Sequence, residues 1–283
     1  MKIVKIDKIK RNQDEIVYDL EVADNHNYFV ENVLVSNCHK VASENQISKI
    51  INKIHTPNKF GFTGTLSDKP IDQWKTIGTF GSVIYEKKSK ELRDEGYISD
   101  VEITALQLNH PKTIKFKYKD ELEYLYKHEK RNQIIAKLAD SISGNVLVMV
   151  NHLDHGDMLL SLMHTRSDKR VFFVKGEMEV EERKKIINLM ENSNDIVCIA
   201  MSSIFSTGIN IKNLPNIIFA GLGKSFIRVV QSIGRGLRLH DNKSKLRIID
   251  VSDNLKYSHS HALHRQNIYN QEQILYKNKE ISL

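Results

Sequence analysis

Asn37 and Cys38 are neighbours whose side chains can together cut and rejoin a polypeptide. The amide nitrogen of an asparagine side chain can attack that residue's own main-chain carbonyl, which cleaves the next peptide bond and leaves a succinimide. A cysteine directly after it supplies a sulfur nucleophile for acyl transfer. The alternative is a turn asparagine followed by an unreactive cysteine. The surrounding sequence distinguishes a cleavage site from such a turn.

Three motifs up to this junction follow one another in a specific order: a β-strand pattern containing Asp19, a turn containing His26, and the tripeptide Ser36-Asn37-Cys38. In this order they resemble the C-terminal splicing region of inteins, most closely the split inteins of the cyanobacterial DNA-polymerase type. The resemblance implies that Asn37 cyclises and Cys38 is the branching nucleophile. It also implies that His26 is the general acid and base of C-terminal cleavage, and that Asp19 assists the first acyl shift. Ser36 stands where many inteins have histidine, a feature that polymerase-type split inteins share.

The nucleophile that begins an intein, and the threonine and histidine block that assists it, have no counterpart in this sequence. The resemblance therefore implies that residues 1–37 are a naturally split C-terminal piece, starting at Met1, that cannot splice alone and needs no cofactor. An alternative is that Met1 is an internal residue of an uninterrupted intein gene. Upstream coding sequence in the same frame would reveal that case.

Arg235 and Arg238 lie three residues apart in the sequence Gln231–Arg238, so in a helix they share one face. A guanidinium group matches the geometry of a nucleotide γ-phosphate, and a pair of them can stabilise the charge that develops during phosphoryl transfer. A basic solvated helix face is the alternative for an isolated pair of this kind. The preceding glutamine and the glycine-containing segment Ser206–Asn210 favour the nucleotide site.

Four segments, taken in order, resemble motifs III to VI of superfamily 2 helicases, closest to phage recombination helicases: Thr63-Gly64-Thr65, Val146–Val150, Ser206–Asn210 and Gln231–Arg238. The resemblance spans roughly residues 38–270. It implies two RecA-like lobes, use of ATP and Mg²⁺, and action on DNA, including branched DNA or RNA–DNA hybrids.

The same resemblance implies a role for each matching residue. Nucleotide-binding residues are expected at Gly208, Asn210, Gln231, Arg235 and Arg238. Arg235 and Arg238 are expected to face the γ-phosphate as arginine fingers, with Arg238 as the favoured one. Thr63, Gly64 and Thr65 are expected to couple the state of the nucleotide to the groove that binds the nucleic-acid strand.

The two resemblances meet at Cys38-His39. Motif II of these helicases reads Asp-Glu-Cys-His, in which the Asp acts through Mg²⁺ and the Glu activates the attacking water. Here Ser36-Asn37 precede the cysteine, so we expect splicing in trans to supply the Asp-Glu. The partner would be an N-terminal half that carries the complementary intein piece and a first RecA-like lobe ending in Asp-Glu. The rival hypothesis is a non-splicing module that associates with its other half or binds nucleic acid without ATPase activity.

The elements that would position these residues change character near Cys38. Residues 1–37 have the alternation of short strands, at Lys2–Lys8, Val17–Val22 and Tyr28–Val35. Further strands are predicted at Lys59–Phe62, 101–108, Val146–Val150, Val171–Val174, Ile196–Ala200, Ile217–Ala220 and Leu246–Val251. Helices are predicted at 41–54, 120–142, 154–165, 178–191, 225–238 and 257–283.

Short apolar strands that alternate with helices indicate an α/β fold with a doubly wound parallel sheet, here RecA-like by the helicase resemblance. The predicted domains are a small β intein fragment (1–37), a partial first RecA-like lobe (38–118) and the second lobe (119–283). Ligands of such sheets bind at the carboxyl ends of the strands.

The amino-acid composition and net charge are typical of a globular protein that binds a polyanion. Hydrophobic residues make up 40% and charged residues 27% of the 283, and no apolar run is long enough to span a membrane. Residues 1–37 have five basic and seven acidic side chains, so the net charge of +7 leaves +9 on the rest. Only two cysteines are present, Cys38 and Cys198, which excludes a disulfide framework and favours a location in the reducing cytoplasm. If the protein is encoded by a phage, this is the cytoplasm of the bacterial host. His259, His261 and His264 lack cysteine or acidic partners at metal-ligand spacing, so no metal site is expected. Trp74 is expected to pack in the core or on the surface, the alternative being stacking on bases.

Overall fold

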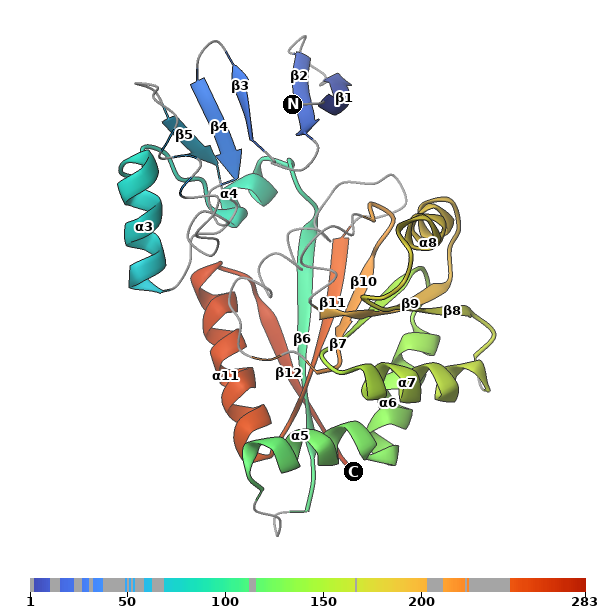
Figure 1. Cartoon of the computed structure of the whole chain (residues 1–283). Helices are drawn as coiled ribbons and strands as arrows, with labels where there is room; N and C mark the ends of the chain where they lie inside the picture. The colour runs from blue at the N-terminus through green and yellow to red at the C-terminus, as the bar shows by residue number, and fades with distance from the viewer. Residues whose placement is uncertain are drawn as a thin grey trace. The chain divides into compact units, whose positions relative to one another are not determined.

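The structure is a computed structural model that describes residues 3–10, 16–22, 27–30, 33–37, 49, 51, 53, 59–62, 69–111, 116–165, 167–202, 211–221, 223 and 245–283. For the strands within residues 3–62 it describes the backbone alone. The chain divides into two compact units, Met1–Glu86 and Lys87–Leu283, coloured by residue number in Figure 1. The domain boundaries expected at 37/38 and 118/119 stay predictions.

The first unit contains two separate small sheets. β1 (Ile3–Lys10) and β2 (Ile16–Val22) form an antiparallel ribbon. The strand predicted over Tyr28–Val35 is instead two antiparallel strands, β3 (Asn27–Val30) and β4 (Val33–Asn37). β4 also pairs in parallel with β5 (Lys59–Phe62), so a strand of the predicted intein piece and a strand of the predicted helicase part share one sheet.

In the first unit, the helix α3 (Pro70–Phe80) lies beside β5. It begins with proline at its first position, where the missing N–H would have no helical partner. It ends at Gly81, whose φ of 89° lies in the left-handed region that glycine adopts without strain.

The second unit is built on one parallel sheet of seven strands in the order β12-β6-β11-β10-β7-β9-β8. Every strand pair in it is parallel, which confirms the predicted doubly wound sheet. The strands are β6 (Asp100–Asn109), β7 (Val146–Val150), β8 (Arg170–Val174), β9 (Ile196–Met201), β10 (Asn216–Phe219), β11 (Lys245–Asp253) and β12 (Tyr276–Ser282).

Helices cover both faces of this sheet (Figure 1). α6 (Glu129–Ser141) and α7 (Leu153–His164) cover one face, and α8 (Val180–Asn192) and α11 (Lys256–Gln271) cover the other. The other described helices of this unit are α4 (Ser89–Asp94) and α5 (Tyr118–Lys127). One hydrophobic core joins β7 and β9 to α8 and α11, and the other joins them to α6 and α7. Leu147 and Met149 of β7 point into the first core, whereas Val146, Val148 and Val150 point into the second. This alternation explains why a completely buried strand reads as a continuous apolar run.

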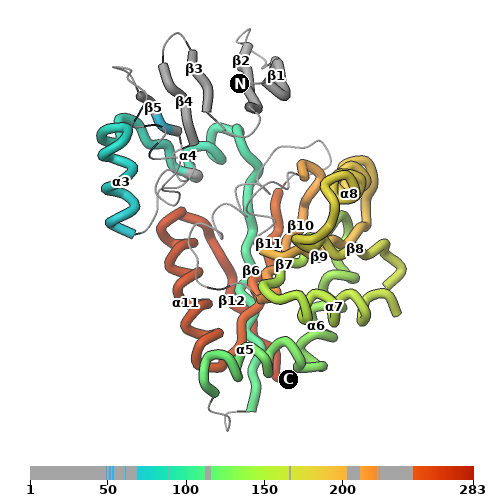
Figure 2. Tube along the Cα trace, viewed as in Figure 1, coloured from blue at the N-terminus to red at the C-terminus, as the bar shows by residue number. Residues whose placement is uncertain are grey.

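Two helix predictions were wrong in their extent. The helix expected over 120–142 is two helices, because His128 has an extended backbone and its ring Nδ1 accepts a hydrogen bond from the Arg131 N–H at 3.2 Å, which caps α6. The helix expected over 257–283 ends at Gln271, and β12 follows it beside β6 (Figure 2). β12 is polar and mostly exposed, so main-chain pairing with β6 forms the strand and no apolar alternation announces it. The helix predicted at 225–238 lies outside the described residues.

Close packing of α7 on β8 depends on Gly156, because a Cβ at this position would overlap the ring of Phe173. The Asp154-His155-Gly156 segment is thereby held at the end of β7, where the candidate site begins. None of the helices that the structure describes is long and apolar enough to cross a membrane.

Candidate nucleotide and nucleic-acid site

The side chains of the predicted site residues lie outside the described part of the structure. Asp19, Ser36 and Asn37 are described as backbone only, in β2 and β4, where Asn37 is in register with Phe62 of β5. The remaining predicted residues are not among the described ones: His26, Cys38, His39, Thr63, Gly64, Thr65, Gly208, Asn210, Gln231, Arg235 and Arg238. Their roles stay predictions.

The described residues nevertheless define the edge of the sheet from which the predicted motifs follow. Residues 203–210 come directly after β9, and residues 224–244 come shortly after β10. Because both strands are parallel to β7, their carboxyl ends lie at the same edge. The second unit therefore presents the edge at which doubly wound sheets bind ligands.

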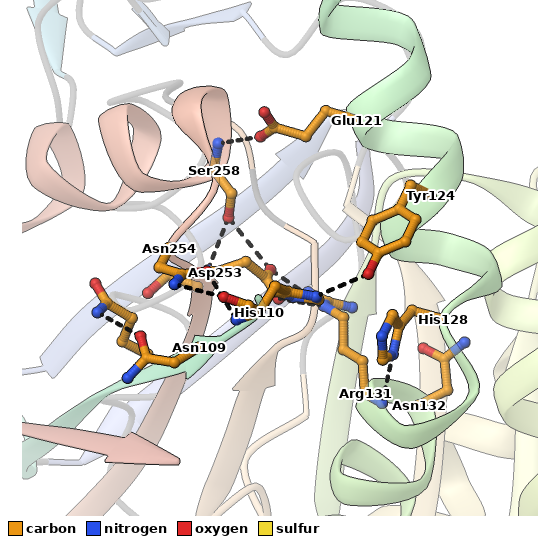
Figure 3. A network of polar contacts seen from close by, with 12 residues as sticks. Asn109, His110, Glu121, Tyr124, His128, Arg131, Asn132, Asp253, Asn254 and Ser258 are labelled. Atoms are coloured by element: carbon orange, nitrogen blue, oxygen red, sulfur yellow. Dashed lines mark hydrogen bonds and ion pairs between the residues drawn. The ribbon is translucent and has the colours of Figure 1, made fainter. Parts of the chain in front are cut away.

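A buried ion pair holds this edge together (Figure 3). Arg131 of α6 donates from Nε to both carboxylate oxygens of Asp253, at 2.9 and 3.1 Å, at the end of β11. His110, which follows β6, places its Nε2 2.8 Å from Asp253 Oδ1. Burial by itself raises the pKa of Asp253, but the charge and hydrogen bonds of Arg131 and His110 outweigh it and hold the pKa below its usual range.

Arg131 also reaches the neighbouring strand. Its Nη2 donates to the main-chain carbonyl of Ala220, directly after β10, at 2.8 Å. One guanidinium thus ties α6 to the ends of β10 and β11. Its Nη1 is buried and makes no hydrogen bond within the described chain.

A second buried ion pair stabilises the ends of β10 and β11 from the opposite face of the sheet. Arg265 of α11 donates from Nε to both oxygens of Asp250 on β11, at 3.0 and 2.9 Å, and Tyr269 Oη donates to Asp250 at 2.8 Å. Arg265 Nη1 also donates to the carbonyl of Gly223 at 3.4 Å. Burial lowers the pKa of Arg265, but the Asp250 carboxylate outweighs burial and raises it. The chain leading into residues 224–244 is therefore held at two carbonyls, those of Ala220 and Gly223.

Glu121 of α5 fixes the start of α11. Its carboxylate accepts hydrogen bonds from the N–H groups of Tyr257 (3.0 and 3.1 Å) and Ser258 (2.7 Å), at the N-terminus of the helix (Figure 3). These are N–H groups that no helical carbonyl can satisfy, and a negative charge there is favoured by the helix dipole. The interaction sets the position of the helix that carries Arg265.

His155 is a fully buried histidine beside this network. Its Nε2 lies 3.1 Å from Asn132 Oδ1, which can only accept, so Nε2 carries the proton. Its Nδ1 is buried and has no hydrogen-bond partner in the described part of the chain. Burial lowers the pKa of His155 to about 3, because protonation would place a charge and an unsatisfied N–H in the core.

His155 should make the unfolding free energy depend on pH. Its folded pKa of about 3 lies below the ordinary 6.5, so between these values the unfolded chain binds the proton and stability falls as pH falls. Lowering the pH from 7 to 5 should cost about 2 kcal/mol through this residue alone. Urea titrations of His155→Gln should show a shallower pH dependence than those of the unchanged protein. His164→Gln, at the exposed end of the same helix, should leave the dependence as it is, and equal slopes for both variants would contradict the assignment.

The residues of the two buried ion pairs have a structural role: they position the edge of the sheet. The guanidiniums and carboxylates of Arg131, Asp253, Arg265 and Asp250 are buried and bonded to one another, so none of them is a free nucleophile or base. Cys198 is buried in β9, and burial raises the pKa of its thiol to about 12, so the thiol stays protonated and unreactive. No cluster of three or more His, Cys, Asp or Glu side chains able to hold a metal occurs among the described residues.

Sequence reasoning missed the two ion pairs. A signal for them does exist, since Asp250 and Asp253 interrupt the end of an apolar strand, and carboxylates buried in a sheet need a partner. The partners come from α6 and α11, which lie 122 and 15 residues away along the chain. No local pattern identifies them.

Comparison with known proteins agrees with this arrangement. Residues 127–240 match the helicase conserved C-terminal domain. The chain is 32% identical over 271 residues to the ATP-dependent DNA helicase UvsW of Enterobacteria phage T4, which covers 87% of this chain and 54% of UvsW. The crystal structure of T4 UvsW superposes with a TM-score of 0.57 at 29% identity, over 88% of this chain and 52% of that one. The chain thus spans about half the length of this relative.

Two further solved structures share the fold. A fragment of a putative HsdR subunit of a type I restriction enzyme from Vibrio vulnificus has a TM-score of 0.67 at 18% identity, over 89% of this chain and 48% of that one. Dbp5 of S. cerevisiae, bound to RNA and ADP BeF3, has a TM-score of 0.58 at 13% identity, over 88% and 59%. The chain therefore contains a helicase C-terminal domain in a RecA-like parallel-sheet lobe, and over most of its length it is similar to the superfamily 2 helicase UvsW.

Proposed function

We propose that this chain is the C-terminal half of a UvsW-like, ATP-dependent DNA helicase. The observation that carries the proposal is the 32% identity to T4 UvsW along 87% of the chain. The buried pairs Arg131–Asp253 and Arg265–Asp250 support it, because they fix the carboxyl edge of the sheet beside the segments that contain the predicted motifs. DNA is the expected nucleic acid, and the positive charge of the chain suits a polyanion.

In this proposal the residues that bind ATP and those that bind Mg²⁺ lie on different halves of the helicase. Gln231, Arg235 and Arg238 would hold the nucleotide phosphates, with Gly208 and Asn210 beside it. This set has guanidinium, amide and main-chain groups and no carboxylate, so it fits an anion and lacks the carboxylates that usually bind Mg²⁺ beside a nucleotide. The metal ligands would come from the Asp-Glu of the other half. Bound ATP supplies the phosphoryl group whose transfer to water drives movement on DNA.

We further propose that residues 1–37 are a split-intein piece that joins the two halves by splicing in trans. The three motifs with Asp19, His26 and Ser36-Asn37-Cys38 support this, and so does their end point inside a helicase motif II. The pairing of β4 with β5 adds a geometric reason. A strand in the place of β4 that ended in Asp-Glu would set these carboxylates next to Phe62, directly before the predicted motif III.

Asn37→Ala and Cys38→Ala should each reduce ligated product to background when the chain is mixed with its complementary half. The first removes the amide that cyclises, and the second removes the branching thiol. Product is measured by mass on a denaturing gel together with ATPase activity. Asn192→Ala and Cys198→Ala, at an exposed helix end and in the core, are the matched controls and should splice normally.

The non-splicing alternative makes the opposite prediction for the same variants. If ATPase and helicase activities survive both Asn37→Ala and Cys38→Ala, the halves work as a non-covalent complex. The proposal of splicing in trans would then fail, while that of a helicase half would stand.

A further inference from the structure

Large apolar side chains gather on the surface of the first unit, in and just after α3. Ile71 (62% exposed), Trp74 (73%) and Ile77 (43%) lie in the helix, and Val83, Ile84 and Tyr85 follow it with between 54% and 79% exposed. These six are close to half of the thirteen large hydrophobic side chains found exposed in the described chain, yet they fall within fifteen residues. Such clustering differs from the scattered exposed hydrophobics of ordinary surfaces and marks an interaction site.

The spacing of the helical members places them on one side of α3. Ile71, Trp74 and Ile77 are three residues apart, so successive side chains lie close together on the helix surface. Thr76, between them in sequence, is buried and donates to the carbonyl of Asp72. Trp74 lies largely in solvent, at 73% exposed.

The sheet of the first unit is also short for an α/β lobe. β5 lies at the edge of a mixed three-stranded sheet, where it pairs in parallel with β4, and β4 pairs antiparallel with β3. Parallel strands of α/β lobes normally lie within larger sheets that helices cover on both faces. The relative T4 UvsW is aligned with this chain over only about half of its length, so a comparable length of polypeptide accompanies these elements there. One missing partner, the rest of their lobe, would cover both the exposed apolar side chains of α3 and the side of β5 that no described strand pairs with.

We propose that the apolar face formed by Ile71, Trp74, Ile77, Val83, Ile84 and Tyr85 is the docking surface for the missing N-terminal part of the first lobe. This inference rests on the proposed function and adds to it. The two helicase halves recognise each other through the lobe itself, without any intein contact and before any peptide bond joins them. The partner surface is accordingly apolar and belongs to the polypeptide whose last strand would take the place of β4 beside β5.

The single tryptophan of the chain makes this surface directly observable. The full chain with Asn37→Ala and Cys38→Ala, which blocks ligation, is labelled with 5-fluorotryptophan and gives one fluorine resonance, from Trp74. The probe is the part of T4 UvsW that precedes the segment aligned with this chain, checked for cooperative unfolding. We expect a solvent-isotope shift of the resonance in the free chain and its loss on saturation with the probe.

Two variants distinguish specific binding at this surface from non-specific hydrophobic association. Ile71→Ser with Ile77→Ser should weaken the affinity for the probe by about tenfold or more, because two apolar contacts are lost. Leu275→Ser removes a still more exposed apolar side chain, in the second unit (89% exposed), and should leave the affinity unchanged.

Three results would overturn the inference. One is a Trp74 resonance without an isotope shift in the free chain, together with a dimer in sedimentation, since a second copy would then cover the face. Another is a resonance unaffected by the probe at about 100 μM. The third is equal affinity for the two variants. The probe contains no intein piece, so a failure of splicing leaves all these readings unchanged and is recognised separately.

Discussion

Replacing Arg238 by alanine in the assembled helicase should lower kcat for ATP hydrolysis by about 10³-fold or more. An arginine finger stabilises charge that develops on the transferred phosphoryl group, so its loss is felt in the transition state far more than in the bound substrate. We therefore expect kcat to fall while KM for ATP changes little. Steady-state ATPase assays in the presence of DNA measure both.

The conservative variant sharpens this test. Arg238→Lys keeps the charge but loses the planar fork, so it should recover only a small part of kcat. Arg247→Ala, an exposed arginine on β11, is the matched control and should keep full activity. Equal activity of Arg238→Ala and Arg247→Ala would show that motif VI has been assigned to the wrong residues.

Replacing Arg131 by methionine should lower the free energy of unfolding by about 3–5 kcal/mol. The change leaves the carboxylate of Asp253 buried without its cation, and it also frees the carbonyl of Ala220. Urea denaturation followed by circular dichroism gives the value. The exposed pair Lys245–Glu102 offers a control, since Lys245→Met should cost less than about 1 kcal/mol.

A double-mutant cycle shows whether the buried pair itself matters. Arg131→Met combined with Asp253→Leu removes both charges and fills the space with apolar groups, so it should recover much of the stability that either single change loses. If the two losses simply add, the residues do not interact energetically, and the network in Figure 3 does not hold the sheet edge.

The parallel sheet was predictable because completely buried strands leave a strong sequence signal. β7 and β9 are runs of apolar residues whose side chains alternate between two cores. β12 left no such signal. It is polar and exposed, and only its main-chain pairing with β6 makes it a strand.

The candidate site likewise has a part that the sequence predicts and a part that it does not. Motifs such as Gln231–Arg238 are contiguous in sequence, so residue type and spacing alone predict their chemistry. The Arg131–Asp253 and Arg265–Asp250 pairs bring together residues from different elements. Their partners are decided by how α6 and α11 pack on the sheet, and that information exists only in the tertiary structure. The break between α5 and α6 is of the same kind, because the cap at His128 competes with a helix that local propensity favours.

Peptide mass spectrometry of the native material tests the central claim most directly. The informative peptide is the one that contains Cys38-His39-Lys40. If the two helicase halves are joined by splicing in trans, Cys38 will be preceded by Asp-Glu encoded by another gene, and residues 1–37 will be found excised. If Cys38 is found only after Ser36-Asn37 while the partner half is present, the account of splicing is contradicted.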